Sequence, residues 1–236
     1  MMDVVRYLND HSFTVLFSGG KDSTAALLWV YDYIKHDDWD ILHIIVTGNT
    51  HPLSVEYVKY VAAELGVLDK LRIVQREINF FDKVREWGPP LIGISRWCLH
   101  QFKLKLIKRY ARKIQVLGIR NSDSSIRMKL KPIDWSYLTK SITVHPIISW
   151  SDEEVYNYIR DHGLDLNPCY DLCGHSGNCM FCPYHDKKAI ILTLQDPYWR
   201  SKILSALKEG RGPISKEIYR KWIKLSKIQT LERWYG

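Results

Sequence analysis

The chain has 236 residues, of which 46% are hydrophobic and 25% charged, and its formal net charge at pH 7 is +8. This composition is that of a folded globular protein, and it excludes a chain that is disordered over long stretches. No apolar run approaches the roughly 20 residues that cross a bilayer, and the N-terminus lacks the basic-then-apolar pattern of a signal peptide. We therefore expect a cytoplasmic protein without a membrane segment.

Short apolar runs alternate with helix-like stretches through the first two thirds of the chain. Strands are expected at 13–17, 41–46, 71–75, 114–117 and 141–144, and helices at 23–34, 54–65, 99–113 and 152–161. Ser151 and Glu154 form a capping box at the start of the last helix, and Asp152 is interpreted as a further capping group. Because strands that alternate with helices pair through right-handed crossovers, the predicted fold is a three-layer α/β sandwich around a parallel, Rossmann-like sheet.

The C-terminal part of the chain differs from the rest in composition. Residues 183–236 contain 8 lysines and 4 arginines against 2 aspartates and 3 glutamates, and their pattern is helical with breaks at 196–197 and 210–213. We therefore expect a main α/β domain at 1–165 and, at 166–236, a cysteine-rich loop with a basic helical extension. Residues 87–122 form a second basic zone, without a carboxylate. Both zones suit a polyanion such as nucleic acid, with solvated helix faces as the alternative.

Several aromatic residues lie within the basic C-terminal part, namely Trp199, Trp222, Trp234 and Tyr235. Aromatic rings between lysines and arginines suit stacking on nucleobases, but they equally suit the buried faces of amphipathic helices. The apolar residues at 215–231 recur at helical spacing. This pattern favours the buried helix face.

A glycine-rich segment, Ser-Gly-Gly-Lys-Asp-Ser-Thr at 18–24, lies between the first predicted strand and the first predicted helix. Backbone N–H groups and the helix dipole point to one spot at such a junction, which suits an anion. The glycines allow close approach of phosphate oxygens, the serines can donate hydrogen bonds, and the lysine adds positive charge. The predicted phosphate ligands are Ser18, Gly19, Gly20, Lys21, Asp22, Ser23 and Thr24.

This segment resembles the SGGxDS pyrophosphate loop of the adenine nucleotide alpha hydrolases. From about residue 13 to about residue 183, the chain resembles the phosphoadenosine phosphosulfate (PAPS) reductase family. The resemblance implies an adenine nucleotide, either ATP with Mg²⁺ or PAPS, and places Lys21 and Asp22 among the catalytic residues. The family carries a DTG-type turn after its second strand. Thr47 and Gly48 match this turn and are expected to bind the nucleotide, whereas Val46 replaces the acidic residue.

A polar segment at 118–127 follows the fourth predicted strand and resembles the G-x-R-x-x-(E/D)-S-x-x-R loop of the same family. The resemblance implies that Arg120 and Arg127 contact the phosphate or sulfate groups of the substrate, in catalytic roles. Guanidinium groups fit tetrahedral oxyanions through paired hydrogen bonds. The end of a parallel strand is also where α/β folds bind their ligands.

Four of the five cysteines lie between 169 and 182 with the spacing C-x3-C-x5-C-x2-C, and Cys98 stands alone far upstream. This crowding is typical of a metal site rather than of a disulfide framework. Two arrangements are compatible with the residues. In one, the four local cysteines bind a structural zinc ion, with His175 or His185 as substitutes, and Cys98 is a small core residue.

In the other arrangement, a 4Fe-4S cluster is held by Cys98, Cys173, Cys179 and Cys182, with Cys169 as an alternate ligand. The resemblance favours this second arrangement. Relatives that carry a cluster supply one cysteine from an Arg-x-Cys segment and two from a later CxxC pair, here Cys98 and the pair Cys179 and Cys182.

Reductases of this family use a catalytic cysteine near the C-terminus, and no cysteine follows Cys182 in this sequence. The leading hypothesis is therefore an ATP pyrophosphatase-type enzyme that adenylates an acceptor, releases pyrophosphate and so activates the acceptor for sulfur transfer. The expected acceptor is nucleic acid. The alternatives are reduction of PAPS or adenosine phosphosulfate (APS), a sulfate adenylyltransferase-like reaction, and a non-catalytic nucleotide-binding accessory subunit. Such folds commonly form homodimers, so a dimer is retained as an expectation.

Overall fold

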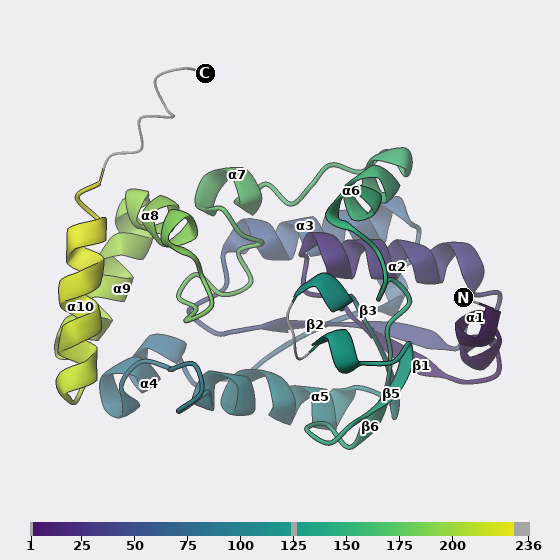
Figure 1. Cartoon of the computed structure of the whole chain (residues 1–236), viewed down its shortest axis with the longest axis horizontal. Helices are drawn as coiled ribbons and strands as arrows, with labels where there is room; N and C mark the ends of the chain where they lie inside the picture. The colour runs from purple at the N-terminus through teal and green to yellow at the C-terminus, as the bar shows by residue number, and fades with distance from the viewer. Residues whose placement is uncertain (1, 124–126, 229–236) are drawn as a thin grey trace.

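A six-stranded sheet forms the centre of the computed structural model, which describes residues 2–123 and 127–228 (Figure 1). Its strands are β1 (Phe13–Leu16), β2 (Trp39–Ile45), β3 (Leu71–Gln75), β4 (Ile114–Leu117), β5 (Ile133–Ser136) and β6 (Ser141–Val144). They lie in the order β3-β2-β1-β4-β6-β5, and all neighbours pair in parallel except β5 and β6. The predicted three-layer α/β fold is confirmed. The antiparallel edge strand β5 was not predicted, because Ile133–Ser136 contains no apolar run long enough to indicate a strand.

Helices lie on both faces of the sheet. They are α1 (Met2–Asn9), α2 (Lys21–Tyr33), α3 (Pro52–Glu64), α4 (Phe80–Trp87), α5 (Lys105–Tyr110), α6 (Asp152–Asp161), α7 (Cys169–Cys173), α8 (Lys187–Gln195), α9 (Pro197–Glu209) and α10 (Pro213–Leu225). Figure 1 shows α2, α3 and α6 on one face and α4 and α5 on the other, with α8, α9 and α10 together at one end. None of the helices in the described part of the chain is long and apolar enough to cross a membrane.

Three of these helices, α1, α4 and α7, were not predicted, because each has eight residues or fewer and so shows little periodicity. The helix predicted at 99–113 begins with a π-helical turn, Leu99–Leu104, and ends at Tyr110. Ala111 is already extended, because the chain turns there into β4. Residues 124–126 of the predicted arginine loop lie outside the described residues.

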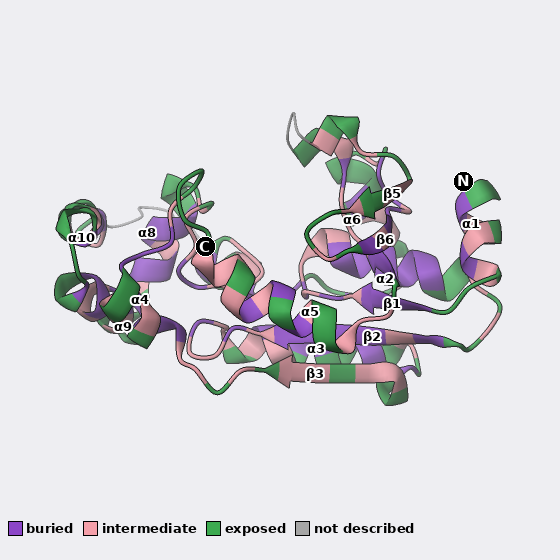
Figure 2. Cartoon of the chain, turned by 90° about the horizontal axis from the view of Figure 1, so that it is seen from below, coloured by how far each residue is buried: buried purple, intermediate pink, exposed green. Residues whose placement is uncertain are grey.

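The main hydrophobic core lies between the sheet and the helices α2 and α3. Its fully buried side chains include Phe13 and Val15 from β1, Leu27 and Trp29 from α2, and Val58 from α3. Burying one side chain of this size contributes about 1.5–3 kcal/mol, so the first strand and the helix after it are held firmly together. Figure 2 shows this buried layer in purple across β1 and α2. The loop between the two elements is therefore held at both ends.

A second hydrophobic core lies at the end of the molecule that carries α8, α9 and α10. Phe80 and Phe102 pack there with Phe181, and Trp222 lies against Phe181 with ring centroids 4.7 Å apart. Trp199 is also buried in this core, so the expected helix-face role holds for both tryptophans. Trp234, Tyr235 and the end of the predicted 215–231 helix lie outside the described residues. Residues from both sides of position 165 share this core, and the division into 1–165 and 166–236 stays a prediction.

Candidate nucleotide-binding site

The loop between β1 and α2 is held by its own hydroxyl groups. Ser23 Oγ donates a hydrogen bond to the carbonyl of Gly20 (2.9 Å) and accepts one from the amide of Ser18 (3.2 Å). Thr24 Oγ1 donates to the same carbonyl at 3.1 Å. Gly19 has a φ of +78°, which side chains with a Cβ rarely adopt. The sequence therefore folds into a tight turn that leads directly into the N-terminus of α2, as an anion site requires.

Two asparagines of the cysteine-rich segment bind the carbonyl groups of this loop. Asn167 Nδ2 donates to the carbonyl of Gly19 (2.8 Å), and Asn178 Nδ2 donates to that of Ser18 (3.1 Å). Tyr170, on α7, accepts the amide hydrogen of Lys21 at 3.0 Å. These contacts join residues about 150 positions apart in the chain. The cysteine-rich segment therefore fixes the orientation of the phosphate loop.

Lys21 lies in a network of carboxylates at the start of α2. Its Nζ is 2.9 Å from Asp22 Oδ1 and 2.6 Å from Asp152 Oδ1. Burial lowers the pKa of Lys21. The hydrogen bonds that Lys21 donates to Asp152 and Asp22 outweigh burial and hold this pKa above its ordinary value. Lys21 also lowers the pKa of Asp152. Both groups are therefore charged at neutral pH.

Arg120 is the most buried cation of this network, with its side chain only 5% exposed. Its Nη2 lies 3.0 Å from Asp152 and 3.2 Å from Asp123, and its Nε lies 2.8 Å from Asp22 Oδ1. The Nε–H nevertheless has no hydrogen-bond acceptor among the described residues, so its contact with Asp22 is Coulombic only. Arg120 therefore places a buried positive charge beside the phosphate loop, held between Asp22, Asp123 and Asp152.

The loop that follows β4 approaches the phosphate loop very closely. A Cβ at Gly118 would lie 2.2 Å from the carbonyl oxygen of Asp22 and 2.6 Å from the amide nitrogen of Ser23. Only glycine allows this approach, which brings Arg120 to the start of α2. Arg127, the second predicted arginine, forms an ion pair with Asp123 at the edge of the same loop, and its side chain is 44% exposed. The structure therefore brings Arg120 into the network and places Arg127 at its margin.

The turn after β2 contains the predicted nucleotide ligands Thr47 and Gly48. The hydroxyl of Thr47 donates a hydrogen bond to the carbonyl of Arg76. Gly48 has a φ of +83°, and a Cβ there would overlap the side chain of Asn79. Asn49, which is fully buried, binds the backbone of Phe181 through both its amide nitrogen (3.0 Å) and its oxygen (2.8 Å). This turn is thus joined to the cysteine-rich segment.

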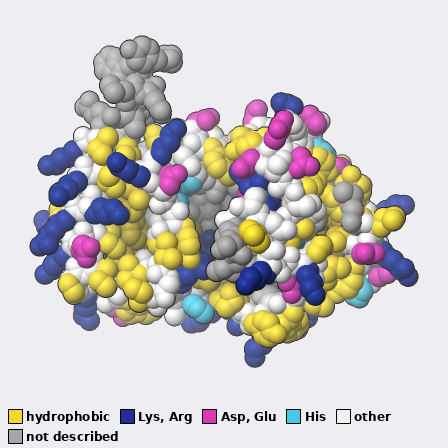
Figure 3. Space-filling model, in the orientation of Figure 1, with side chains coloured by type: hydrophobic (Ala, Val, Ile, Leu, Met, Phe, Trp, Pro, Cys, Tyr) yellow, Lys and Arg dark blue, Asp and Glu magenta, His cyan; other side chains and the backbone are white. Residues whose placement is uncertain are grey.

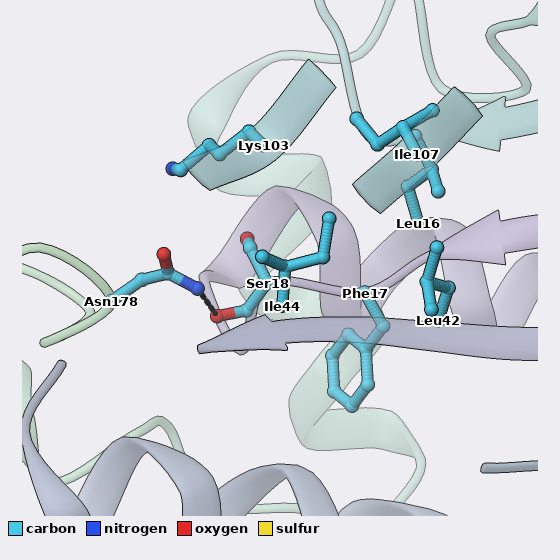
Figure 4. Close-up of a pocket in the computed structure, with 8 residues that line it drawn as sticks. All are labelled: Leu16, Phe17, Ser18, Leu42, Ile44, Lys103, Ile107 and Asn178. Atoms are coloured by element: carbon cyan, nitrogen blue, oxygen red, sulfur yellow. Dashed lines mark hydrogen bonds between the residues drawn. The ribbon is translucent and has the colours of Figure 1, made fainter. Parts of the chain in front are cut away.

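An open cavity lies beside the phosphate loop, at the carboxyl ends of β1 and β2 (Figure 4). Leu16, Leu42, Ile44 and Ile107 form an apolar wall. Polar groups stand at the rim, and their side chains point away from the wall; they belong to Ser18, Lys103 and Asn178. Apolar walls with a few polar groups are typical of sites for heterocyclic ligands. The cavity is therefore the candidate site for the base of a nucleotide whose phosphates lie on the loop.

His43, on β2 between the cavity residues Leu42 and Ile44, is fully buried. Its Nδ1 donates to the carbonyl of Phe17 at 2.8 Å, while its Nε2 has no partner among the described residues. Burial lowers the pKa of His43 to about 4. The folded protein therefore keeps His43 neutral over a pH range in which the unfolded chain, with a pKa near 6.5, binds a proton.

This difference in pKa predicts a pH-dependent stability. The contribution of neutral His43 to the free energy of unfolding is fully present above pH ~7. It is lost progressively as the pH falls from about 6.5 to about 4, by up to about 3 kcal/mol. Urea unfolding between pH 7.5 and 4.5 measures it. We expect His43→Asn to be less stable than the wild type at pH 7.5 but to show a smaller decrease in unfolding free energy with falling pH. An unchanged decrease would show that His43 is not its source.

The structure divides the five cysteines into two groups. Cys98, Cys179 and Cys182 line one cavity of about 110 Å³ together with Lys103. The largest effect on the pKa of Lys103 comes from Cys179, which raises it, whereas burial lowers it. Cys182 and Cys98 raise this pKa further. Among the described residues, no group of three or more His, Cys, Asp or Glu side chains is arranged to hold a metal ion. The three thiols surround a space next to an ammonium group.

Cys173, the fourth predicted cluster ligand, lies in the other group. Its Sγ donates to the carbonyl of Cys169 at 3.0 Å and lies 3.8 Å from His175 Nδ1. His175 stacks on His185 with ring centroids 3.9 Å apart. Cys173 and Cys169 are both buried on α7. Cys173 is thus not among the residues that line the cavity of Cys98, Cys179 and Cys182, and the four-cysteine ligand sets for the cluster and for zinc stay predictions.

Sequence reasoning missed four residues of this site. Asp152 was interpreted as a helix cap; the capping box of Ser151 is present, but Asp152 itself binds Lys21 and Arg120. Asn167, Tyr170 and Asn178 were also missed. Their side chains act on a loop that is distant in the sequence, and no local spacing indicates such a contact. Only the position of Asp152 in the first turn of a helix after a strand offered a signal.

Comparison with known proteins identifies the family of the chain. The phosphoadenosine phosphosulfate reductase domain matches residues 12–184. An uncharacterized protein of Methanocaldococcus jannaschii is 28% identical over 179 residues, which are 74% of this chain and 42% of that protein. An adenosine 5'-phosphosulfate reductase of Bacillus cereus strain Q1 is 34% identical over 189 residues, 69% of this chain and 80% of that protein.

Among solved structures, a PAPS reductase from Candida auris has a TM-score of 0.53 at 18% identity, and the match covers 72% of this chain and 83% of that one. This likeness concerns the fold. The domain match spans most of the chain and includes the phosphate loop, the arginine loop and the cysteine-rich segment. The chain belongs to the phosphoadenosine phosphosulfate reductase family.

Proposed function

We propose that the chain binds ATP with Mg²⁺ and transfers the adenylyl group to an acceptor oxygen, releasing pyrophosphate. The acceptor oxygen forms a bond to the α-phosphorus, and the bond from this phosphorus to the bridging oxygen breaks. The electron pair leaves with pyrophosphate, and the acceptor proton goes to water. A hydrosulfide ion, supplied as the sulfur donor, then attacks the activated carbon, and AMP leaves with the electron pair of the broken carbon–oxygen bond. The proposal thus combines nucleotide activation with sulfur transfer.

One observation carries this proposal: Lys21 and the buried Arg120 converge at the N-terminus of α2 through their shared contacts with Asp22 and Asp152. Pyrophosphate gains negative charge as it leaves, and fixed cations in a partly buried site stabilise that charge. Loop amides and the helix dipole add to this effect. Asp22 and Asp152 hold the two cations in place. Mg²⁺ would enter with the phosphates, as part of the substrate.

A nucleic acid is the acceptor class that the surface supports. The exposed face of α10 carries Lys216, Arg220, Lys221 and Lys224, against a single carboxylate, Glu217. Figure 3 shows lysine and arginine side chains gathered along the side of the molecule formed by α9 and α10. Such a surface attracts phosphates without regard to sequence. We therefore propose that a strand of nucleic acid binds there while its reacting base enters the site.

Sulfonucleotide reduction is the second candidate, supported by the name of the Bacillus relative as an adenosine 5'-phosphosulfate reductase. In that reaction a thiolate attacks the sulfur of the nucleotide, AMP leaves with the electron pair, and a second thiol releases sulfite. The nucleophile would have to be one of the cysteines described above, since none follows Cys182. An assay for products separates the two candidates.

The protein, purified without oxygen, is incubated in parallel with ATP and Mg²⁺, with APS and with PAPS, each with single-stranded RNA or DNA and a sulfide donor. Pyrophosphate formed from ATP, dependent on the nucleic acid, is the result that the proposal expects. Sulfite formed from APS or PAPS, without pyrophosphate from ATP, would replace the proposal by the reductase. A nucleotide that binds but does not react would indicate an accessory subunit.

The cysteine cavity fits an iron-sulfur cluster in part. Cys98, Cys179 and Cys182 surround a space larger than a single ion needs, and the ammonium of Lys103 would offset the negative charge of a thiolate-bound cluster. Cys173 hydrogen-bonds to Cys169 and does not line this cavity. We propose a 4Fe-4S cluster held by the three cavity cysteines. When bound, it would supply sulfur handling or electron transfer next to the nucleotide.

Substitution of Cys98 tests this ligand set. We expect Cys98→Ala to lose most of the bound iron and acid-labile sulfide of the anaerobically purified protein, because one of three ligands is removed. Cys173→Ala is the matched variant, and we expect it to keep both. Iron that is unchanged in Cys98→Ala would exclude the cavity as the cluster site, and loss in both variants would restore the four-cysteine set. Zinc in place of iron would support the zinc alternative.

A further inference from the structure

A third cavity, of about 330 Å³, lies between the turn after β2 and the N-terminus of α9. One side is formed by Gly48, Thr50, His51 and Pro52, and the other by Asp196, Tyr198, Trp199 and Lys202. None of these residues other than Gly48 belongs to the nucleotide site described above. The volume is at the lower end of the range of about 300–1,000 Å³ for small-molecule sites, which suits one nucleoside.

The cavity is built from aromatic rings. Trp199 is 4% exposed and forms its floor, with the ring of His51 tilted against it at 5.9 Å between centroids. Tyr198 is 60% exposed and meets Trp199 edge to face at 5.1 Å. An exposed tyrosine beside a buried tryptophan offers a planar surface for stacking.

Hydrogen-bonding groups of both kinds stand around these rings. Lys202 Nζ donates to the hydroxyl of Tyr198 at 2.8 Å and lies 4.9 Å from the centroid of that ring. In the described part of the chain no carboxylate forms an ion pair with Lys202. Asp196 accepts from the amides of Tyr198 and Trp199 through one oxygen, Oδ1. A donor and an acceptor beside an aromatic surface match the hydrogen-bonding groups at the edge of a nucleobase.

The cavity is connected to the phosphate loop by a short series of hydrogen bonds. Thr50, on its wall, donates to the carbonyl of Asn178 at 2.8 Å, and Asn178 in turn donates to the carbonyl of Ser18. His51 accepts the amide hydrogen of Leu53 and caps α3, which packs beside Gly19. A ligand here would lie close to the reacting nucleotide without occupying its site.

We infer that this cavity binds one unpaired base of the nucleic acid acceptor, stacked on Tyr198 and bound at its edge by Lys202 and Asp196. The inference rests on the proposed function. The basic face of α10 follows α9 directly in the chain and packs against it, so phosphates on either side of the base would meet lysines and arginines. A single strand is favoured over a duplex, because a paired base cannot reach a cavity of this kind.

Fluorescence anisotropy with a labelled 12-nucleotide single strand of thymidine tests the inference, at low salt and with the full chain. We expect Tyr198→Ala to weaken binding by about 5- to 100-fold, the effect of losing one stacked base. Tyr198→Phe keeps the ring and should bind within about threefold of the wild type. Tyr137→Ala removes a tyrosine that is 86% exposed elsewhere, between β5 and β6, and should bind like the wild type.

Photo-crosslinking locates the base directly. A strand with 5-iodouracil at one position is irradiated on the protein, and the crosslinked peptide is identified by mass spectrometry. Attachment at Tyr198 or His51 is the expected result. Equal binding of Tyr198→Ala and the wild type, or a crosslink only to α10, would overturn the inference.

Two further outcomes also decide against this cavity. Competition by free thymidine monophosphate as strong as that by the strand would show a mononucleotide site instead. Failure of the wild type to bind any strand would overturn the inference, and with it the nucleic acid acceptor. Binding of ATP and formation of pyrophosphate are measured separately, so this failure is distinguishable from failure of nucleotide activation.

Discussion

Arg120→Ala is expected to reduce the affinity of the chain for ATP by roughly 10- to 100-fold, because a buried cation whose interaction with phosphate is worth about 1.5–3 kcal/mol is lost. The side chain is 5% exposed and faces Asp22, Asp123 and Asp152. Without it, the three carboxylates face the phosphates with Lys21 as the nearest remaining cation. Calorimetric titration of ATP with Mg²⁺ measures the loss.

Two variants separate this effect from a general loss of structure. Arg120→Lys keeps the charge but not the planar fork, and we expect intermediate affinity. Arg112 is the matched control, because it also pairs with two aspartates, Asp38 and Asp40. It precedes β4, whereas Arg120 follows this strand, so the two arginines lie at opposite ends of β4. Arg112→Ala should bind ATP like the wild type. Equal affinity of Arg120→Ala and Arg112→Ala would contradict the proposed role of Arg120.

Gly118→Ala is expected to have the largest effect of any single methyl group in the site. The added Cβ would lie 2.2 Å from the carbonyl oxygen and 2.3 Å from the carbonyl carbon of Asp22. These are backbone atoms, so the phosphate loop and the arginine loop must separate. Overpacking of this kind costs about 1–3 kcal/mol or more in stability. We expect a lower midpoint of thermal unfolding and ATP affinity reduced by at least about tenfold.

Gly163→Ala provides the control for this variant. Gly163, just after α6, has a φ of +68°, and a Cβ there would have no heavy atom within 4 Å. Its substitution costs about 1 kcal/mol through backbone strain alone, and ATP affinity should not change. Unchanged affinity in Gly118→Ala would mean that the close approach of the two loops is not needed for binding.

The sequence predicted those parts of the fold that depend on neighbouring residues. The strand at 71–75 and the helix at 152–161 have the predicted bounds, because an apolar run and a capping box are local signals. The phosphate loop was recognisable for the same reason. Strand β5 and the short helix α4 were missed, since their positions depend on partners elsewhere in the chain.

The contacts that complete the site could not be predicted in this way. Asn167 and Gly19 are 148 residues apart, and nothing near either of them indicates that they bind each other. The role of Asp152 was hidden by its position in a capping box, which accounts for an acidic residue there without any ligand. Cys98 was grouped with Cys179 only through the family resemblance. Cys173, on α7, hydrogen-bonds to Cys169 and does not line the cavity of Cys98 and Cys179.

The most direct test of phosphate binding at the loop between β1 and α2 is a calorimetric titration of the intact, anaerobically purified chain with ATP and Mg²⁺. The same titration is carried out with Lys21→Ala for comparison. Lys21 touches both Asp22 and Asp152 and lies at the start of α2, where the phosphates are proposed to bind. We predict that the wild type binds one adenine nucleotide per chain and that the variant binds it with an affinity at least about tenfold lower. Equal affinity in the two proteins would contradict the placement of the phosphates on this loop.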